Sequence, residues 1–197
     1  MNKEEFRIDY NFNINDFKEI EDIERDYFPE RNISKSEEVM KWYEKNNLTC
    51  VCVRNSENKI IASATILPLN KTVFYDVYND IMNEADIVES QIEKYENDNS
   101  YYLYLSSISV RKEYLNNYRL ITKLLKGCID LFELLKCRNI KINNVMADAS
   151  SIHGEKICKK LLKMEYVRDT SHNSKIYAVD GDKFIESMKR LKKFYKV

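Results

Sequence analysis

The pattern of apolar and polar positions changes most clearly in the middle of this chain. Residues 102–110 are rich in aromatic and β-branched side chains, which predicts a strand. A short polar turn follows, and from Leu120 to Leu135 apolar residues recur at helical spacing, which predicts a long amphipathic helix. The first turn of such a helix has backbone N–H groups without carbonyl partners, so it can bind a phosphate. An ordinary strand-to-helix connection is the alternative.

The pattern before this central unit predicts a short strand and two helices. Residues 6–10 form the strand. Asn15 is the expected N-cap of the first helix, which stops near Pro29, and Ser34 or Ser36 is the expected N-cap of the second.

A hairpin is predicted next, because two β-branched runs flank the polar turn Asn-Ser-Glu-Asn. Its strands span residues 48–54 and 59–67, and Pro68 ends it. Residues 70–99 then show two helical patterns. We interpret this segment as an insertion, which either shapes a binding face or adds packing.

Five further elements are predicted after the central helix. Residues 139–147 form a strand, and a helix follows with Ile157, Cys158, Leu161 and Leu162 on its apolar side. Residues 166–168 and 174–179 form two last strands. A basic amphipathic helix at about 181–197 closes the chain, and it is either docked on the surface or in contact with a membrane or nucleic acid.

Length and charge narrow the choice of protein class. The 197 residues fit one domain, 1–197, and no apolar run is long enough to span a bilayer. The N-terminus has no apolar segment typical of a secretory signal, so a cytoplasmic protein is expected. The net charge is zero, but residues 101–197 hold 20 Lys and Arg against 10 Asp and Glu. That half is where an anionic partner would bind.

The cysteines and histidines do not form a metal-binding pattern. Five cysteines are an odd number for a disulfide framework, and Cys50 and Cys52 share one face of a predicted strand as small core residues. The two histidines are His153 and His172, and no Cys-x-x-Cys pair exists. No metal site is expected.

The order of elements from about Phe6 to Val179 resembles that of the Gcn5-related N-acetyltransferases (GNAT). SISVRKEYLNNYRLITKLL is similar to the family's central strand, pyrophosphate loop and helix, and HGEKICKKLLKMEYV to its later helix and strand. The loop departs from the family pattern because Leu115 to Leu120 contain no glycine and no leading Arg or Gln. Asn116 and Asn117 tolerate left-handed geometry better than most residues do, so a nest of backbone N–H groups that binds phosphate is not excluded at this turn.

The resemblance implies a three-layer α+β fold, with a mixed, mostly antiparallel sheet of about seven strands flanked by helices. It also implies acetyl-CoA, or another acyl-CoA, as cofactor. Pantetheine would then lie along the central strand, and the diphosphate at the loop and helix N-terminus. The cofactor-binding residues carried over are Ile108, Ser109, Val110, Asn116, Asn117, Tyr118, Arg119, Leu120, Lys123 and Ser151.

Acyl transfer needs a base for the incoming amine and an acid for the departing thiolate. No carboxylate lies within residues 102–110, so a base there would act through water or from opposite strands. The tyrosine that the family often uses as acid falls on Leu161, which leaves Cys158, His153 and Tyr177 as candidate catalytic residues.

Two function classes remain open. The first is an acyl-CoA-dependent N-acyltransferase that transfers the acyl group directly, in a ternary complex, to an amine of a small molecule or protein. The second is a GNAT-like domain without catalysis that binds a ligand, protein or nucleic acid. Nucleic acid is not the expected partner, because base-reading motifs are missing. A membrane is not expected as a partner either, and a homodimer is left open.

Overall fold

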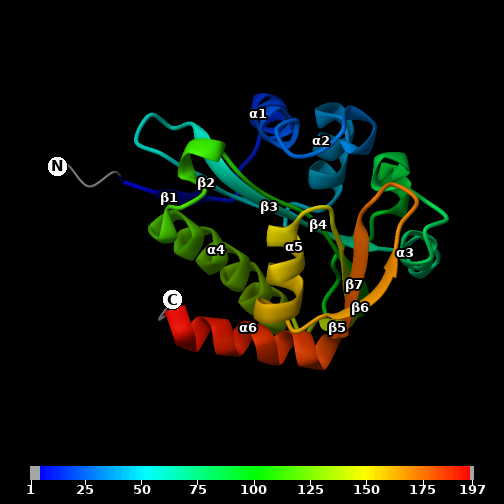
Figure 1. The fold of residues 1–197 in the computed structure, drawn as a ribbon. Coiled ribbons are helices and arrows are strands. Elements are labelled where there is room, and N and C mark those ends of the chain that lie inside the picture. The colour runs from blue at the N-terminus through cyan, green and yellow to red at the C-terminus, as the bar shows by residue number, and fades with distance from the viewer. Residues whose placement is uncertain (1–4, 196–197) are drawn as a thin grey trace.

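The computed structural model describes residues 5–195, which are coloured in Figure 1. The first four residues of the predicted domain and the last two of the predicted closing helix lie outside this range. Within it, seven strands form one sheet in the order β1-β2-β3-β4-β5-β7-β6. The strands are Arg7–Asp9 (β1), Cys50–Arg54 (β2), Ile60–Leu69 (β3), Ser100–Val110 (β4), Lys141–Ala149 (β5), Glu165–Asp169 (β6) and Lys175–Asp180 (β7).

Helices cover both faces of this sheet (Figure 1). The α-helices are Ile14–Glu24 (α1), Ser36–Lys45 (α2), Lys71–Tyr78 (α3), Tyr118–Cys137 (α4), Ile152–Lys156 (α5) and Gly181–Tyr195 (α6). α1, α2 and α3 pack on one face, and α4, α5 and α6 on the other. The predicted three-layer α+β fold is therefore confirmed. In residues 5–195 no helix combines the length and apolar character needed to cross a bilayer.

Only β4 and β5 are parallel neighbours, and all other strand pairs are antiparallel. β2 and β3 are buried at every residue, because helices cover both of their faces. On the α4 face Phe132 packs against Phe184 of α6, with ring centroids 5.0 Å apart. On the opposite face Trp42 of α2 and Phe74 of α3 pack in one cluster with Tyr104 of β4.

The prediction that Pro68 ends the hairpin is wrong. β3 continues to Leu69, and Pro68 is paired with Leu103 of β4. β2 accompanies β3 only as far as Thr65, so no strand on that side needs an N–H from Pro68. The carbonyl of Pro68 accepts the N–H of Glu93 instead, at 2.7 Å.

The first helix begins earlier than predicted. Asn13, and not Asn15, is the N-cap of α1, and its side chain accepts the N–H of Asn15 at 2.9 Å. Asp16 completes a capping box by accepting the N–H of Asn13. The helix ends at Glu24, before the predicted stop at Pro29.

The second helix has a cap from another part of the chain. Lys35 occupies the N-cap position of α2, and neither Ser34 nor Ser36 caps it. Glu21 of α1 accepts the N–H of Ser36 at 2.8 Å, so a carboxylate from the first helix replaces the expected serine.

The segment 70–99 contains only one of its two predicted helices. The first pattern forms α3, whereas the second forms two short 3₁₀ turns, Glu84–Asp86 and Glu89–Gln91. Ile87 and Ile92 of this part are still buried, so their apolar side chains serve packing without a regular helix.

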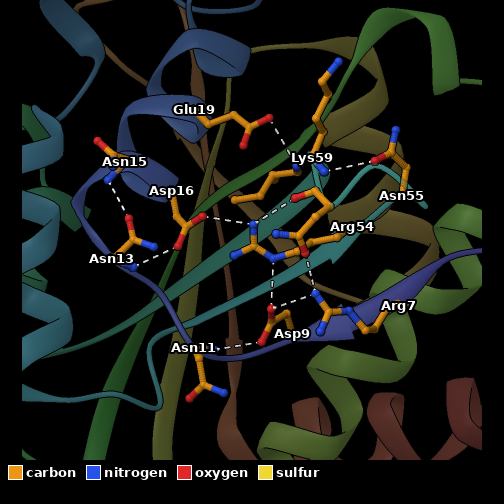
Figure 2. Close-up of polar contacts among 12 residues, drawn as sticks. Arg7, Asp9, Asn11, Asn13, Asn15, Asp16, Glu19, Arg54, Asn55 and Lys59 are labelled. Atoms are coloured by element: carbon orange, nitrogen blue, oxygen red, sulfur yellow. Dashed lines mark hydrogen bonds and ion pairs between the residues drawn. The ribbon is translucent and has the colours of Figure 1, made fainter.

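A buried arginine ties α1 to the edge of the sheet (Figure 2). Arg54 of β2 is 5% exposed and lies between Asp9 of β1 and Asp16 of α1. Its Nε is 2.9 Å from an Asp9 carboxylate oxygen, and a terminal nitrogen is 2.9 Å from one of Asp16. Burial alone would raise the pKa of Asp9, but the Asn11 N–H and Arg54 outweigh it and hold that pKa below its usual value.

Candidate functional site

The central strand carries a β-bulge where the sheet opens. Thr65 of β3 pairs with Ser107 and Ile66 with Leu105, so Ser106 is the extra residue. The bulge breaks the alternation of β4, and both Ser106 and Ser107 face the side covered by α1 and α2. Two hydroxyl groups therefore point to the same space.

β4 and β5 separate at the same point. Their parallel pairing runs only as far as Leu105 with Ala147, although β4 continues to Val110. The N–H of Arg111 bonds to Ile61 of β3, so alternation turns the peptide groups of Ile108 and Val110 toward the unpaired side. This segment offers strand-like hydrogen bonds to an extended ligand.

Two adjoining hollows lie beside the bulge, on the α1 side. We call them the outer and the inner hollow. The outer hollow, about 450 Å³ including its open mouth, is lined by Glu24, Phe28, Asn32, Asn83, Glu84, Tyr104, Ser106, Ser107, Asp148, Ser150, His172 and Ser174. The inner hollow is lined by Phe17, Ile20, Glu21, Glu24, Ser34, Ser36, Val39, Trp42, Thr65, Glu84, Ser106 and Ser107. No Lys or Arg of the described chain lines either of them.

Glu24, the last residue of α1, belongs to both hollows. Its pKa is raised to about 7, because burial and, less strongly, the carboxylates of Glu84 and Glu21 raise it while the hydroxyl of Ser107 lowers it. A carboxyl group that titrates near neutral pH can accept a proton from an amine.

Glu84 also belongs to both hollows and comes from the segment between α3 and β4. Its carboxylate accepts hydrogen bonds from Ser106 Oγ at 2.6 Å and Tyr104 Oη at 2.8 Å. Burial raises the pKa of Glu84, and these two hydroxyl groups counteract the rise while Asp148 adds to it.

Asp148 of β5 is the third carboxylate. Burial raises its pKa, with Ser174 and His172 acting in the opposite direction. His172 lies between Asp148 and Asp80, with ring nitrogens 3.7 Å and 3.8 Å from their carboxylate oxygens. His172 lies in the loop between β6 and β7 and lines the outer hollow.

The predicted cofactor-binding residues on β4 differ in exposure. Ile108 is 41% exposed at the open edge, whereas Ser109 and Val110 are buried. Ser109 Oγ lies 2.8 Å from Ser63 Oγ, and the carbonyl of Val110 accepts the hydroxyl of Tyr27. Backbone groups of Ile108 and the N–H of Val110 remain for a ligand.

The predicted phosphate turn forms the start of α4. Asn117 is its N-cap, with φ −86°, and its side chain accepts the N–H of Leu120. Neither Asn116 nor Asn117 adopts the left-handed geometry that the sequence left open. The N–H groups of Tyr118 and Arg119 have no acceptor among the described residues.

The side chains at this helix start divide into two groups. Leu120 is fully buried in the core, so only its backbone lies near the turn. Arg119 and Lys123 are exposed and form no ion pair with a described residue, and Tyr118 is 64% exposed. Two free cations therefore stand beside the positive end of a long helix, an arrangement that suits a diphosphate.

None of the predicted catalytic residues lines the carboxylate hollows. Cys158 is buried in the core, and burial raises the pKa of its thiol to about 12. Tyr177 is buried in the same core cluster and donates its hydroxyl to Glu155 at 3.0 Å. His153 is exposed in α5, whose N-cap Ser151 accepts the N–H of Gly154 at 3.0 Å.

Sequence reasoning missed the three carboxylates because it searched the central strand for a base. They come from α1, from the segment after α3 and from β5, and the strand supplies serines instead. One signal was available: Glu24 follows Phe17 and Ile20 at helical spacing, so it continues an apolar stripe.

Comparison with solved structures identifies the fold, although no protein-family model and no curated protein matches the sequence. The GphF GNAT-like decarboxylase in complex with isobutyryl-CoA is 10% identical, with a TM-score of 0.57, over 89% of this chain and 98% of that one. An agmatine N-acetyltransferase in its apo form is 9% identical, with a TM-score of 0.54, over 89% and 99%. Ard1 from Thermoplasma volcanium is 8% identical, with a TM-score of 0.53, over 89% and 94%. This chain therefore has the fold of the Gcn5-related N-acetyltransferases.

Proposed function

We propose that the protein is an acyl-CoA-dependent N-acyltransferase that transfers an acyl group directly to an amine. The observation that carries this proposal is the meeting of two features at Ser106 and Ser107. An unpaired strand edge begins there, and a hollow with the carboxyl group of Glu24 opens beside it. The structural neighbours include one protein solved with isobutyryl-CoA and one named for N-acetylation of agmatine, which supports both halves of the reaction.

The acyl-CoA fits the open edge of the sheet. Pantetheine would pair with the backbone of Ile108 and Val110, since an amide-bearing chain can take the place of the missing strand. The diphosphate would lie at the N-terminus of α4 beside Arg119 and Lys123. The bound thioester supplies the acyl group and a thiolate leaving group.

Glu24 would act as the general base. A protonated amine must lose a proton before it attacks the thioester carbonyl, and a carboxylate with a pKa of about 7 can take that proton at neutral pH. The new C–N bond forms as the C–S bond breaks, and the thiolate takes up a proton. Of the candidate donors Cys158, His153 and Tyr177, only His153 is exposed, so we place this role there.

Calorimetric titration with CoA and acetyl-CoA, followed by an assay of thiol release with amines, tests the proposal. We expect saturable binding and amine-dependent release of free CoA. Absence of binding at millimolar cofactor would refute the proposal. Binding without thiol release for any amine would favour a ligand-binding domain that has lost catalysis.

Replacing Arg119 and Lys123 together by alanine should raise the Kd for CoA about tenfold, because two charge-assisted contacts to the diphosphate are lost. Calorimetry measures this change. The matched control is Lys189→Ala with Lys193→Ala, which removes the same charge from exposed positions of α6. An acetyl-pantetheine thioester, which has no diphosphate, should bind the Arg119 and Lys123 double variant and the control variant with the same Kd. If the double variant has an unchanged Kd for CoA, the diphosphate binds elsewhere.

A further inference from the structure

The two hollows have an acidic lining. Glu24, Glu84 and Asp148 face them, and the lining of both contains no Lys or Arg in the described chain. The remaining acidic group, Glu21, is satisfied by Arg25 at 2.6 Å and by the N–H of Ser36. Glu24 and Glu84 form no ion pair with a described residue, and Asp148 has only His172, at 3.7 Å. Partly buried carboxylates with so little positive charge nearby are costly for the fold, and a positively charged ligand would compensate them.

Each hollow also holds a buried oxygen that lacks a hydrogen-bond donor. Ser34 lines the inner hollow and is 7% exposed, and among the described residues its Oγ has no partner within hydrogen-bond distance, although its hydroxyl lies near enough to Glu84 to lower the pKa of that carboxyl group. Asp148 lines the outer hollow, and its Oδ1 is buried without a partner. Buried acceptors are normally satisfied, and an ammonium group brings three donors. One such acceptor in each hollow points to two ammonium groups.

Part of the wall of the inner hollow is apolar and suits a hydrocarbon chain. Phe17, Ile20 and Trp42 line the inner hollow, and all three are buried residues of the core. The two hollows share Glu24, Glu84, Ser106 and Ser107, so they adjoin along these residues, and an elongated ligand that displaces these side chains would occupy both. Its methylene groups would contact the apolar wall while its ends reach the carboxylates.

We propose that the acyl acceptor is a linear diamine whose reacting amine lies beside Glu24 and Asp148 in the outer hollow. Its second ammonium group is held in the inner hollow by Glu84 and Ser34. This inference rests on the proposed acyl transfer and specifies its acceptor. Glu84 is then a specificity-determining residue, because Ser106 and Tyr104 orient its carboxylate without neutralising it.

The test compares linear diamines of increasing chain length with the n-alkylamine of each length. We expect kcat/KM for the best diamine to exceed that of its monoamine by about 10- to 100-fold, as a second charged hydrogen-bonded contact would give. Glu84→Gln keeps the side-chain oxygen but removes the charge, and Ser34→Ala removes the unpaired hydroxyl. Each variant should reduce the preference for the diamine. Glu57→Gln, which changes a 67% exposed carboxylate outside both hollows, is the matched control and should retain it.

Binding to the protein without acyl-CoA separates this inference from the proposed reaction. Trp42 is the only tryptophan and lines the inner hollow, so its fluorescence reports a diamine bound there. A fluorescence change that Glu84→Gln weakens supports the diamine site, even if no acyl transfer is found and the proposed function fails. Acyl transfer to diamines and monoamines with equal kcat/KM would overturn the inference and leave the proposed function intact. The inference would also be overturned if Glu84→Gln lowered kcat/KM for the diamine and for the monoamine by the same factor.

Discussion

Glu24→Gln is expected to lower kcat/KM for acyl transfer by about 100- to 10,000-fold, the range in which a general base contributes. Glutamine has nearly the same shape and can still accept a hydrogen bond from Ser107, but it cannot take a proton from the amine. The assay of CoA release measures the loss. Asp22→Asn, an exposed carboxylate on the same helix, is the control and should keep its rate.

The pH profile should distinguish a catalytic role of Glu24 from a structural one. The wild-type kcat/KM should rise with pH through about 7, because the base acts only when it is deprotonated. The variant should lack this inflection. If Glu24→Gln keeps both the rate and the inflection, another group is the base.

The same substitution should increase stability above neutral pH. The pKa of Glu24 is about 7 in the folded protein and 4.5 as its ordinary value, so the unfolded state binds fewer protons between these values. Wild-type stability attributable to this group therefore falls as pH rises from 4.5 to about 7. Because Glu24 is half-buried and partly screened, we expect a gain of about 1 kcal/mol in the variant above pH 7. Urea unfolding at two pH values measures it.

Arg54→Ala should destabilise the fold by about 3–5 kcal/mol, because it leaves Asp16 without a cation and Asp9 with only the exposed Arg7. Arg54 is 5% exposed and joins Asp9 of β1 to Asp16 of α1 (Figure 2). The free energy of unfolding in urea measures the loss. Because α1 carries Glu24 at its other end, activity should also fall at temperatures where the variant is still folded.

Arg7→Ala is the control for this prediction. Arg7 pairs with the same Asp9 at 3.6 Å, but its side chain is 62% exposed. Solvent screens such a pair, so the expected loss is below about 1 kcal/mol. Equal losses in the two variants would show that burial of the Arg54 pair does not contribute to stability as argued.

Local pattern was sufficient for the central strand and helix. The β-branched run at 102–110 and the apolar spacing from Leu120 to Leu135 lie within β4 and α4. The two-residue repeat of a strand and the 3.6-residue repeat of a helix both involve residues close in sequence, because backbone geometry alone decides which side chains share a face. The element order was sufficient to recognise the fold for the same reason.

The local pattern of apolar and polar residues did not predict strand register or helix capping. The bulge at Ser106 depends on how β3 lies against β4, and Pro68 is tolerated only because β2 ends early. The start of α2 depends on Glu21 of α1. Each of these outcomes is decided by a partner far away in the chain.

What the sequence by itself determined is the order of the strands and most of the helices, including the strand, turn and long helix of β4 and α4. Only the tertiary structure decided where the acidic groups lie. Glu24, Glu84 and Asp148 look like ordinary charged residues in three separate segments, and packing brings them to two adjoining hollows without a Lys or Arg among the described lining residues. The physical reason is that a pKa, a charge balance and a cavity depend on neighbours in space, which periodicity along one chain does not specify.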